Sequence, residues 1–187
     1  GAMVSSRIKQ SPFAAKFADY GQMGVESEIV LRLGHPLPAS GAPYTRESVA
    51  DSVDAAMAGI EIADLRHVNM ATIDATMLIS DNAMNNGCII GLAVTDWRRF
   101  DLGALKCRMI VNGQVVGEGH GRDAHGHPLE ALAWLANRLA KRGGRGLEKG
   151  DLVMTGSLVV NKVLNKGDTM VTEIEGLGEA KIGRAHV

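Results

Sequence analysis

The chain has 187 residues, of which 45% are hydrophobic and 22% are charged, a composition typical of a globular protein with one substantial core. Its 20 Lys and Arg residues nearly balance 21 Asp and Glu residues, for a net charge of -1, so we expect no nucleic-acid partner, which would need a basic surplus. We also expect no membrane span and no signal peptide. The two cysteines, Cys88 and Cys107, are predicted to be free thiols in the cytoplasm.

Both ends of the chain are unusual. It begins Gly1-Ala2-Met3, which fits either a protease scar or the interior of a longer reading frame. Residues 182–187 (IGRAHV) match the translation of a common sequencing adapter. No repeat or low-complexity stretch divides the rest, so we expect a single domain over residues 1–187, with its last six residues adapter-derived in this interpretation.

The clearest strand pattern in the first third of the chain covers residues 25–33 (VESEIVLRL). Apolar and polar residues alternate there, and successive side chains of a strand point to opposite faces. Glu26 and Glu28 therefore share a face. Residues 35–43, rich in Pro and Gly, are predicted to form a loop.

A helix is predicted after Thr45, which is a suitable N-cap. It ends near Gly59, and residues 60–63 return as a short strand. Four residues are predicted to lie on one face of this helix: Val49, Val53, Ala56 and Met57.

The middle of the chain is predicted to contain a helix over residues 70–80, a polar turn over 81–87 and a buried strand over 88–94. Asn112-Gly113 then joins two strands, 105–111 and 114–117, and this dipeptide is the strongest short signal for a β-hairpin.

A long helix begins at Pro128, a favoured first helical residue, and ends at Gly143-Gly144. Its apolar face carries Leu129, Leu132, Leu135 and Leu139. Strands over 152–155 and 170–174, with a turn at 166–168, complete the chain. Strands predominate and do not alternate regularly with helices, so the fold class is α+β with about three helices.

Three carboxylates are the main candidates for chemistry. Glu26 and Glu28 project from the same strand face, where like charges repel each other. A hard cation such as Mg²⁺ or Mn²⁺ removes that cost, because it prefers oxygen ligands. Glu61, on the short strand at 60–63, is a suitable third ligand. Such pairs are also common on solvated strand faces, so the pair alone does not distinguish the two interpretations.

Three histidines, His120, His125 and His127, lie within eight residues of each other and suggest zinc at first sight. Their spacing matches no standard zinc pattern. We expect them to have loop and helix-cap roles. Cys88 lies in an apolar strand and is expected to be a core residue rather than a nucleophile.

Five segments resemble, in order, the 2-keto-4-pentenoate hydratase group of the fumarylacetoacetate hydrolase superfamily. The group also includes the 4-oxalocrotonate decarboxylases. The resemblance implies the strand-rich mixed β-sandwich or roll of the fumarylacetoacetate hydrolase C-terminal type. The segments are 24–38 (GVESEIVLRLGHPLP), 60–66 (IEIADLR), 81–91 (DNAMNNGCIIG), 126–137 (GHPLEALAWLAN) and 150–157 (GDLVMTGS).

This resemblance implies that Glu26, Glu28 and Glu61 ligate Mg²⁺ or Mn²⁺. The expected substrate-binding residues are Asp81, Asn82, Thr155, Gly156 and Ser157, the last three beside the substrate carboxylate. The chain departs from the family pattern at Val159-Val160, where a Thr-Gly pair is common, so the shape of the pocket is open there.

Proton transfer in the family depends largely on a lysine in a segment before the part that matches Gly1. The resemblance therefore implies an N-terminally truncated fragment. Lys9 and Lys16 do not stand in the expected motif and are expected on the solvated surface. Asp19 is the remaining candidate for the catalytic proton-transfer group.

The implied function is a divalent-metal-dependent hydratase that adds water to a 2-hydroxy-2,4-dienoate in the catabolism of aromatic compounds. Three alternatives stay open: a 4-oxalocrotonate decarboxylase, an acylpyruvate C–C hydrolase, and a non-catalytic metal-binding partner subunit. The implied partners are a small 2-oxo or 2-hydroxydienoic acid and further copies of the chain, in a homo-oligomer.

Overall fold

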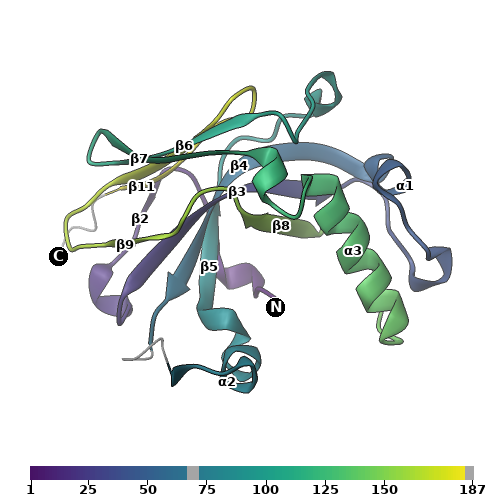
Figure 1. Ribbon diagram of the computed structural model, residues 1–187, viewed down its shortest axis with the longest axis horizontal. Helices are drawn as coiled ribbons and strands as arrows, with labels where there is room; N and C mark the ends of the chain where they lie inside the picture. The colour runs from purple at the N-terminus through teal and green to yellow at the C-terminus, as the bar shows by residue number, and fades with distance from the viewer. Residues whose placement is uncertain (67–71, 184–187) are drawn as a thin grey trace.

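Two mixed β-sheets packed face to face form the protein, as the computed structural model shows for residues 1–66 and 72–183 (Figure 1). The first sheet has the order β1-β5-β4-β3-β8, with β9 paired to the other end of β3, and the second has the order β2-β11-β10-β6-β7. The strands are β1 (Ile8–Gln10), β2 (Phe13–Ala14), β3 (Met23–Leu33), β4 (Val53–Asp64), β5 (Asn85–Ile90), β6 (Lys106–Val111), β7 (Gln114–His120), β8 (Leu152–Ser157), β9 (Lys162–Leu164), β10 (Met170–Ile174) and β11 (Gly178–Gly183).

Three α-helices accompany the sheets in the described residues: α1 (Arg46–Ala50), α2 (Ala75–Ser80) and α3 (Pro128–Lys141). In Figure 1, α3 lies beside β8 and α1, and α2 lies at the far edge of the molecule. Short 3₁₀ helices are η1 (Ser5–Arg7), η2 (Phe17–Asp19), η3 (Ala39–Gly41), η5 (Asn82–Met84), η6 (Trp97–Arg99) and η7 (Gly121–Asp123). The strand-rich α+β class is confirmed. No helix in the described part of the chain is long and apolar enough to cross a membrane.

The main core lies between the two sheets, with apolar side chains contributed by β3 and β4 on one side and by β6, β10 and β11 on the other. One polar contact crosses it: the hydroxyls of Ser27 on β3 and Thr172 on β10 are hydrogen-bonded at 2.7 Å, both fully buried. Cys88 and Cys107 are free and buried, and burial raises the pKa of each thiol to about 12. The prediction of buried free thiols, with Cys88 in the core, is therefore confirmed.

The helix predicted from Thr45 to Gly59 is wrong in its extent. Thr45 does cap a helix, because its hydroxyl accepts the Ser48 N–H, but α1 ends at Ala50. Residues 53–64 form β4, which lies between β3 and β5 and is buried on both faces. A strand buried on both faces has no alternation of apolar and polar residues. The closely spaced alanines of β4 therefore gave a pattern that resembles the apolar face of a helix.

Other predicted elements are confirmed with shifted boundaries. The 25–33 strand is β3, and the strand predicted over 88–94 begins earlier, at Asn85, and ends at Ile90. The hairpin is present, with left-handed φ values of 50° at Asn112 and 81° at Gly113. The helix predicted over 70–80 begins at Ala75, and the part of that prediction at residues 70–71 lies outside the described residues.

The prediction that residues 182–187 are adapter-derived can be compared with the structure only at residues 182 and 183. Ile182 is buried in β11 and pairs with both Met170 and Phe13, whereas residues 184–187 lie outside the described residues. β1, β2, β9 and β11 were not predicted, because strands of two to six residues carry little periodic signal.

His127 has the predicted helix-cap role. Its Nδ1 accepts the Leu129 N–H at 3.1 Å at the start of α3, and its Nε2 lies 3.4 Å from a carboxylate oxygen of Asp101. Burial lowers the pKa of His127 below its ordinary value of 6.5, and the positive charge of Arg46 lowers it further. His127 is therefore a neutral cap at pH 7.

Replacing this cap gives a first prediction. We expect His127→Ala to lower the free energy of unfolding by about 1 kcal/mol, the usual effect of losing an N-cap, and His127→Asn to lose less, because Asn caps well. The contribution of His127 to stability should fall as the pH drops below about 6.5, since the unfolded chain then binds the proton that the folded His127 resists. Urea unfolding at several pH values measures both effects. A pH dependence that persists unchanged in His127→Asn would contradict this assignment.

Candidate metal centre

Glu26, Glu28 and Glu61 come together in the middle of the first sheet. Glu26 and Glu61 are directly opposite each other in the antiparallel β3–β4 pair, and Glu28 lies two residues further along β3. One carboxylate oxygen from each lies within 4.8 Å of the others. The alternation in residues 25–33 thus placed Glu26 and Glu28 on one face, and strand pairing added Glu61.

Glu28 is the most buried of the three carboxylates, with 2% of its surface exposed. The β3–β8 pairing shifts register between Glu28 and Val30, and in this bulge Gly156 (φ 113°) points its N–H at Glu28 Oε2, 2.8 Å away. Burial raises the pKa of Glu28 well above its ordinary value of 4.5, and the neighbouring Glu61 raises it further. The Gly156 N–H only partly offsets this rise.

Glu26 is half-buried and lies toward the open side of the cluster. Burial raises the pKa of Glu26, and the charge of Glu61 adds to that rise. Hydrogen bonds from the side chains of Ser157 and Asn161 act in the opposite direction. Ser157 is the last residue of β8 and Asn161 lies four residues further on, so the end of this strand and the segment after it support Glu26.

Glu61 is held from the neighbouring strand β5. The side-chain amide of Asn85 donates a hydrogen bond of 2.6 Å from Nδ2 to Glu61 Oε1. Cys88, which lies opposite Glu61 in the β4–β5 register, brings an apolar and uncharged neighbour. Asn85 was not singled out in the sequence, although the polar run at 85–86 just before a buried strand was the signal that could have found it.

The cluster fits a hard divalent cation. Within residues 1–66 and 72–183, no lysine, arginine or histidine forms an ion pair with any of the three glutamates. Three carboxylates that crowd a partly dry site without a counter-charge repel one another. The donor set is made only of oxygens, which Mg²⁺ and Mn²⁺ prefer. Their role as metal ligands stays a prediction.

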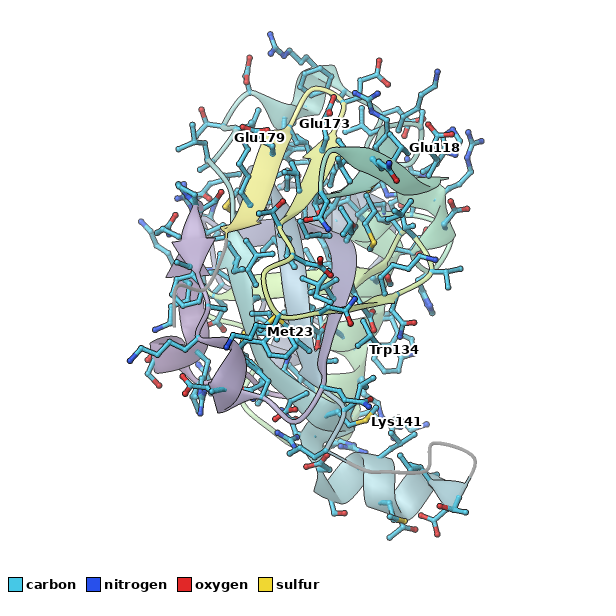
Figure 2. The ribbon with its side chains drawn as sticks, turned by 90° about the vertical axis from the view of Figure 1, so that its left-hand side faces the viewer. Met23, Glu118, Trp134, Lys141, Glu173 and Glu179 are labelled. Carbon is cyan, nitrogen blue, oxygen red and sulfur yellow. The ribbon has the colours of Figure 1, made fainter. Side chains whose placement is uncertain are left out.

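A hollow of about 480 Å³ opens beside Glu26. Its floor is the segment that follows β8, and Glu118 and Asp123 give its rim an acidic character. Figure 2 shows Glu118 at one end of the molecule, on the same sheet as Glu173. The lining residues are Glu26, Glu118, Asp123, Ser157, Leu158, Val159, Val160 and Asn161. Val159-Val160, where the chain departs from the family pattern, therefore shapes this hollow.

The predicted substrate-binding residues on β8 are all engaged by the protein itself. The Thr155 hydroxyl donates to the Ile29 carbonyl at 2.8 Å, and the Gly156 N–H donates to Glu28. The Ser157 hydroxyl is engaged by Glu26 and by the Val159 carbonyl, at 2.7 Å from the latter, although Ser157 also lines the hollow. Substrate binding by this segment therefore stays a prediction.

Asp81, Asn82 and Asp19 lie away from the three glutamates. Asp81 pairs with Arg66 at 2.8 Å, and Asn82 exchanges two hydrogen bonds with the backbone of Ala2. Asp19 is exposed at the end of η2 and belongs neither to the carboxylate cluster nor to the lining of the hollow. Their binding and catalytic roles stay predictions, without support from a contact at the site.

The chain is similar in sequence to a known protein family and to two hydratases. The pattern of the family described as fumarylacetoacetate (FAA) hydrolase C-terminal matches residues 6–182. The chain is 35% identical to the 2-hydroxyhexa-2,4-dienoate hydratase of Comamonas testosteroni over 89% of its length, and 31% identical to the 2-keto-4-pentenoate hydratase of Paraburkholderia phymatum over 97%. It spans 62% and 68% of those two proteins.

A solved structure shares the arrangement of the two sheets. The 4-oxalocrotonate decarboxylase from Pseudomonas putida G7, complexed with magnesium and adipate, superposes with a TM-score of 0.87. It is 27% identical in sequence, and the match covers 96% of this chain and 66% of the decarboxylase.

Proposed function

The chain belongs to the fumarylacetoacetate hydrolase family, and from this membership we propose that it is the metal-binding domain of a hydratase that adds water to a 2-hydroxy-2,4-dienoate. The observation that carries the proposal is the cluster of Glu26, Glu28 and Glu61, whose oxygens lie within 4.8 Å in a site where no residue that the structure describes supplies a counter-charge. The similarity to two dienoate and pentenoate hydratases supports the choice of substrate class.

The three glutamates would hold Mg²⁺ or Mn²⁺. When bound, the cation supplies Lewis acidity toward the carboxylate and 2-oxo oxygens of a small acid. The chain's own residues have three tasks in this proposal. The Gly156 N–H orients the buried Glu28, Ser157 and Asn161 hold Glu26 in place, and the wall formed by Leu158 and Val159 excludes water from one side of the hollow.

A proton-transfer group is still required for hydration. Glu118 and Asp123 line the hollow whereas Asp19 does not, so these two carboxylates are better candidates than Asp19 if the substrate binds in the hollow. Asp123 also accepts the His120 N–H at 2.7 Å, which holds its carboxylate in place. Glu118 is the freer of the two carboxylates, although it lies opposite Arg108 in the hairpin.

A second candidate is a 4-oxalocrotonate decarboxylase. The fold of the Pseudomonas putida G7 enzyme favours it, since that enzyme matches with the TM-score of 0.87 given above. Product analysis separates the two activities: hydration of a 2-hydroxydienoate consumes its diene absorbance without gas release, whereas decarboxylation releases CO₂. We also propose homo-oligomers, which sedimentation of the purified chain would test.

Metal-dependent binding of a small 2-oxo acid tests the proposal directly. We expect the purified chain to bind pyruvate or oxalate in the presence of Mn²⁺ and not in the presence of EDTA, because the acid completes the coordination that the three carboxylates begin. Isothermal titration calorimetry measures the binding of the cation and the binding of the acid. Acid binding that is equal with Mn²⁺ and with EDTA would refute the proposed function.

A further inference from the structure

Each of the three glutamates has hydrogen-bond donors of the protein on its carboxylate. Gly156 N–H binds Glu28 Oε2, and Asn85 Nδ2 binds Glu61 Oε1. Glu26 accepts bonds from Ser157 and Asn161. For Glu28 and Glu61 the donor occupies one named oxygen, Oε2 and Oε1 respectively, and leaves the second oxygen of each carboxylate without a hydrogen bond from that donor.

The contact to Glu61 is the shortest of these and comes from an unusual piece of backbone. Asn82, Ala83 and Met84 have φ values of 51°, 55° and 62°, three consecutive non-glycine residues in the left-handed region. The left-handed conformation is unfavourable for residues with a Cβ atom and persists only where the surroundings hold it. Here Asn82 is bonded to Ala2 through both its amide oxygen and its amide nitrogen.

This turn delivers two adjacent asparagines to two different carboxylates. Asn85 reaches Glu61, at 2.6 Å, whereas Asn86 reaches Asp64 Oδ2, at 3.3 Å. Asp64 is not part of the cluster; it accepts the Gly21 and Gln22 N–H groups before β3. The two asparagines are therefore adjacent in the chain, identical in residue type and both partly buried. They differ in the carboxylate to which each one donates a hydrogen bond.

We propose that Asn85 is a positioning residue of the metal centre: it confines Glu61 to ligation through a single oxygen and so favours small octahedral cations over Ca²⁺. This inference rests on the proposed function. Mg²⁺ and Mn²⁺ take six ligands at short distances, whereas Ca²⁺ takes up to about eight oxygens and often binds a carboxylate through both of them. An oxygen that already accepts a hydrogen bond from Asn85 is a poor second ligand.

The test compares Mn²⁺ and Ca²⁺ binding by calorimetry in the wild type, Asn85→Ala and Asn86→Ala. Partners that orient a ligand typically change metal affinity by about 10–100-fold. We expect a loss of that size for Mn²⁺ in Asn85→Ala and a smaller loss for Ca²⁺, so that the preference for Mn²⁺ over Ca²⁺ falls. Asn86→Ala should bind both cations like the wild type, although both variants lose one hydrogen bond.

Thermal unfolding of the metal-free variants shows whether each one folds, and Asn85→Ser, which is too short to reach Glu61, repeats the test if the alanine variant does not. Wild-type binding of Mn²⁺ with an unchanged preference in the Asn85 variants overturns the role of Asn85 and leaves the metal centre intact. An equal loss in Asn86→Ala also overturns it, because the effect would then come from the turn. Failure of the wild type to bind Mn²⁺ overturns the proposed function as well.

Discussion

Replacing Glu28 by Gln is expected to stabilise the metal-free protein and to abolish its stabilisation by Mn²⁺. Glu28 is 2% exposed beside Glu61 and Glu26, and a buried charge without a counter-ion costs free energy. Glutamine keeps an oxygen for the Gly156 N–H and removes the charge, so we expect a gain of about 1–3 kcal/mol at neutral pH. The same change removes a proposed metal ligand.

Glu28 makes the stability of the metal-free protein depend on pH with a definite sign. Because the folded state raises the pKa of Glu28 above its ordinary value of 4.5, the folded protein holds a proton that the unfolded chain releases. Stability from this group is therefore full below about pH 4.5 and is lost as the pH rises toward the raised value. Glu28→Gln should flatten this part of the profile.

Calorimetric melting with EDTA and with excess Mn²⁺, from pH 5 to 8, measures both effects. Saturation at a hundred times the dissociation constant stabilises a folded protein by about 2.7 kcal/mol, and only the wild type should show such a shift. A metal-free Glu28→Gln protein that melts below the wild type, or one that keeps the Mn²⁺ shift, would show that Glu28 has a different role.

Gly119→Ala is expected to destabilise the protein and to disturb the hollow. A Cβ atom at Gly119 would lie 1.9 Å from the backbone oxygen of Leu158, and one at neighbouring Gly117 would lie 2.3 Å from Val159. β7 therefore has glycines where the segment after β8 crosses it closely. Backbone must move to relieve the clash, and overpacking of this kind costs about 1–3 kcal/mol or more.

Because Leu158 and Val159 line the hollow, Gly119→Ala should also weaken binding of pyruvate in the presence of Mn²⁺. Gly144→Ala is the matched control: a Cβ there meets only the Leu139 carbonyl at 3.6 Å, so we expect a change within about 0.5 kcal/mol. Equal melting temperatures and equal pyruvate affinity for Gly119→Ala and Gly144→Ala would refute the close crossing.

Local patterns were sufficient for elements whose signal lies within the element itself. The β6–β7 hairpin follows from Asn112-Gly113, since few other dipeptides adopt two left-handed residues easily. The helix α3 follows from Pro128 at its start and a leucine face. Local patterns failed for β4, because burial on both faces removes the alternation that distinguishes a strand, and for the short edge strands, whose pairing partners are distant in sequence.

The sequence by itself determined that Glu26 and Glu28 share a strand face and offered Glu61 as a third carboxylate, and resemblance to a family strengthened the choice of Glu61. Only the tertiary structure decided the rest of the centre. Pairing of β3 with β4 set Glu61 opposite Glu26, a bulge in β8 aimed Gly156 at Glu28, and a left-handed turn brought Asn85 to Glu61. Periodicity reports which side of one strand a residue occupies, whereas these contacts depend on register between strands, which no single strand specifies.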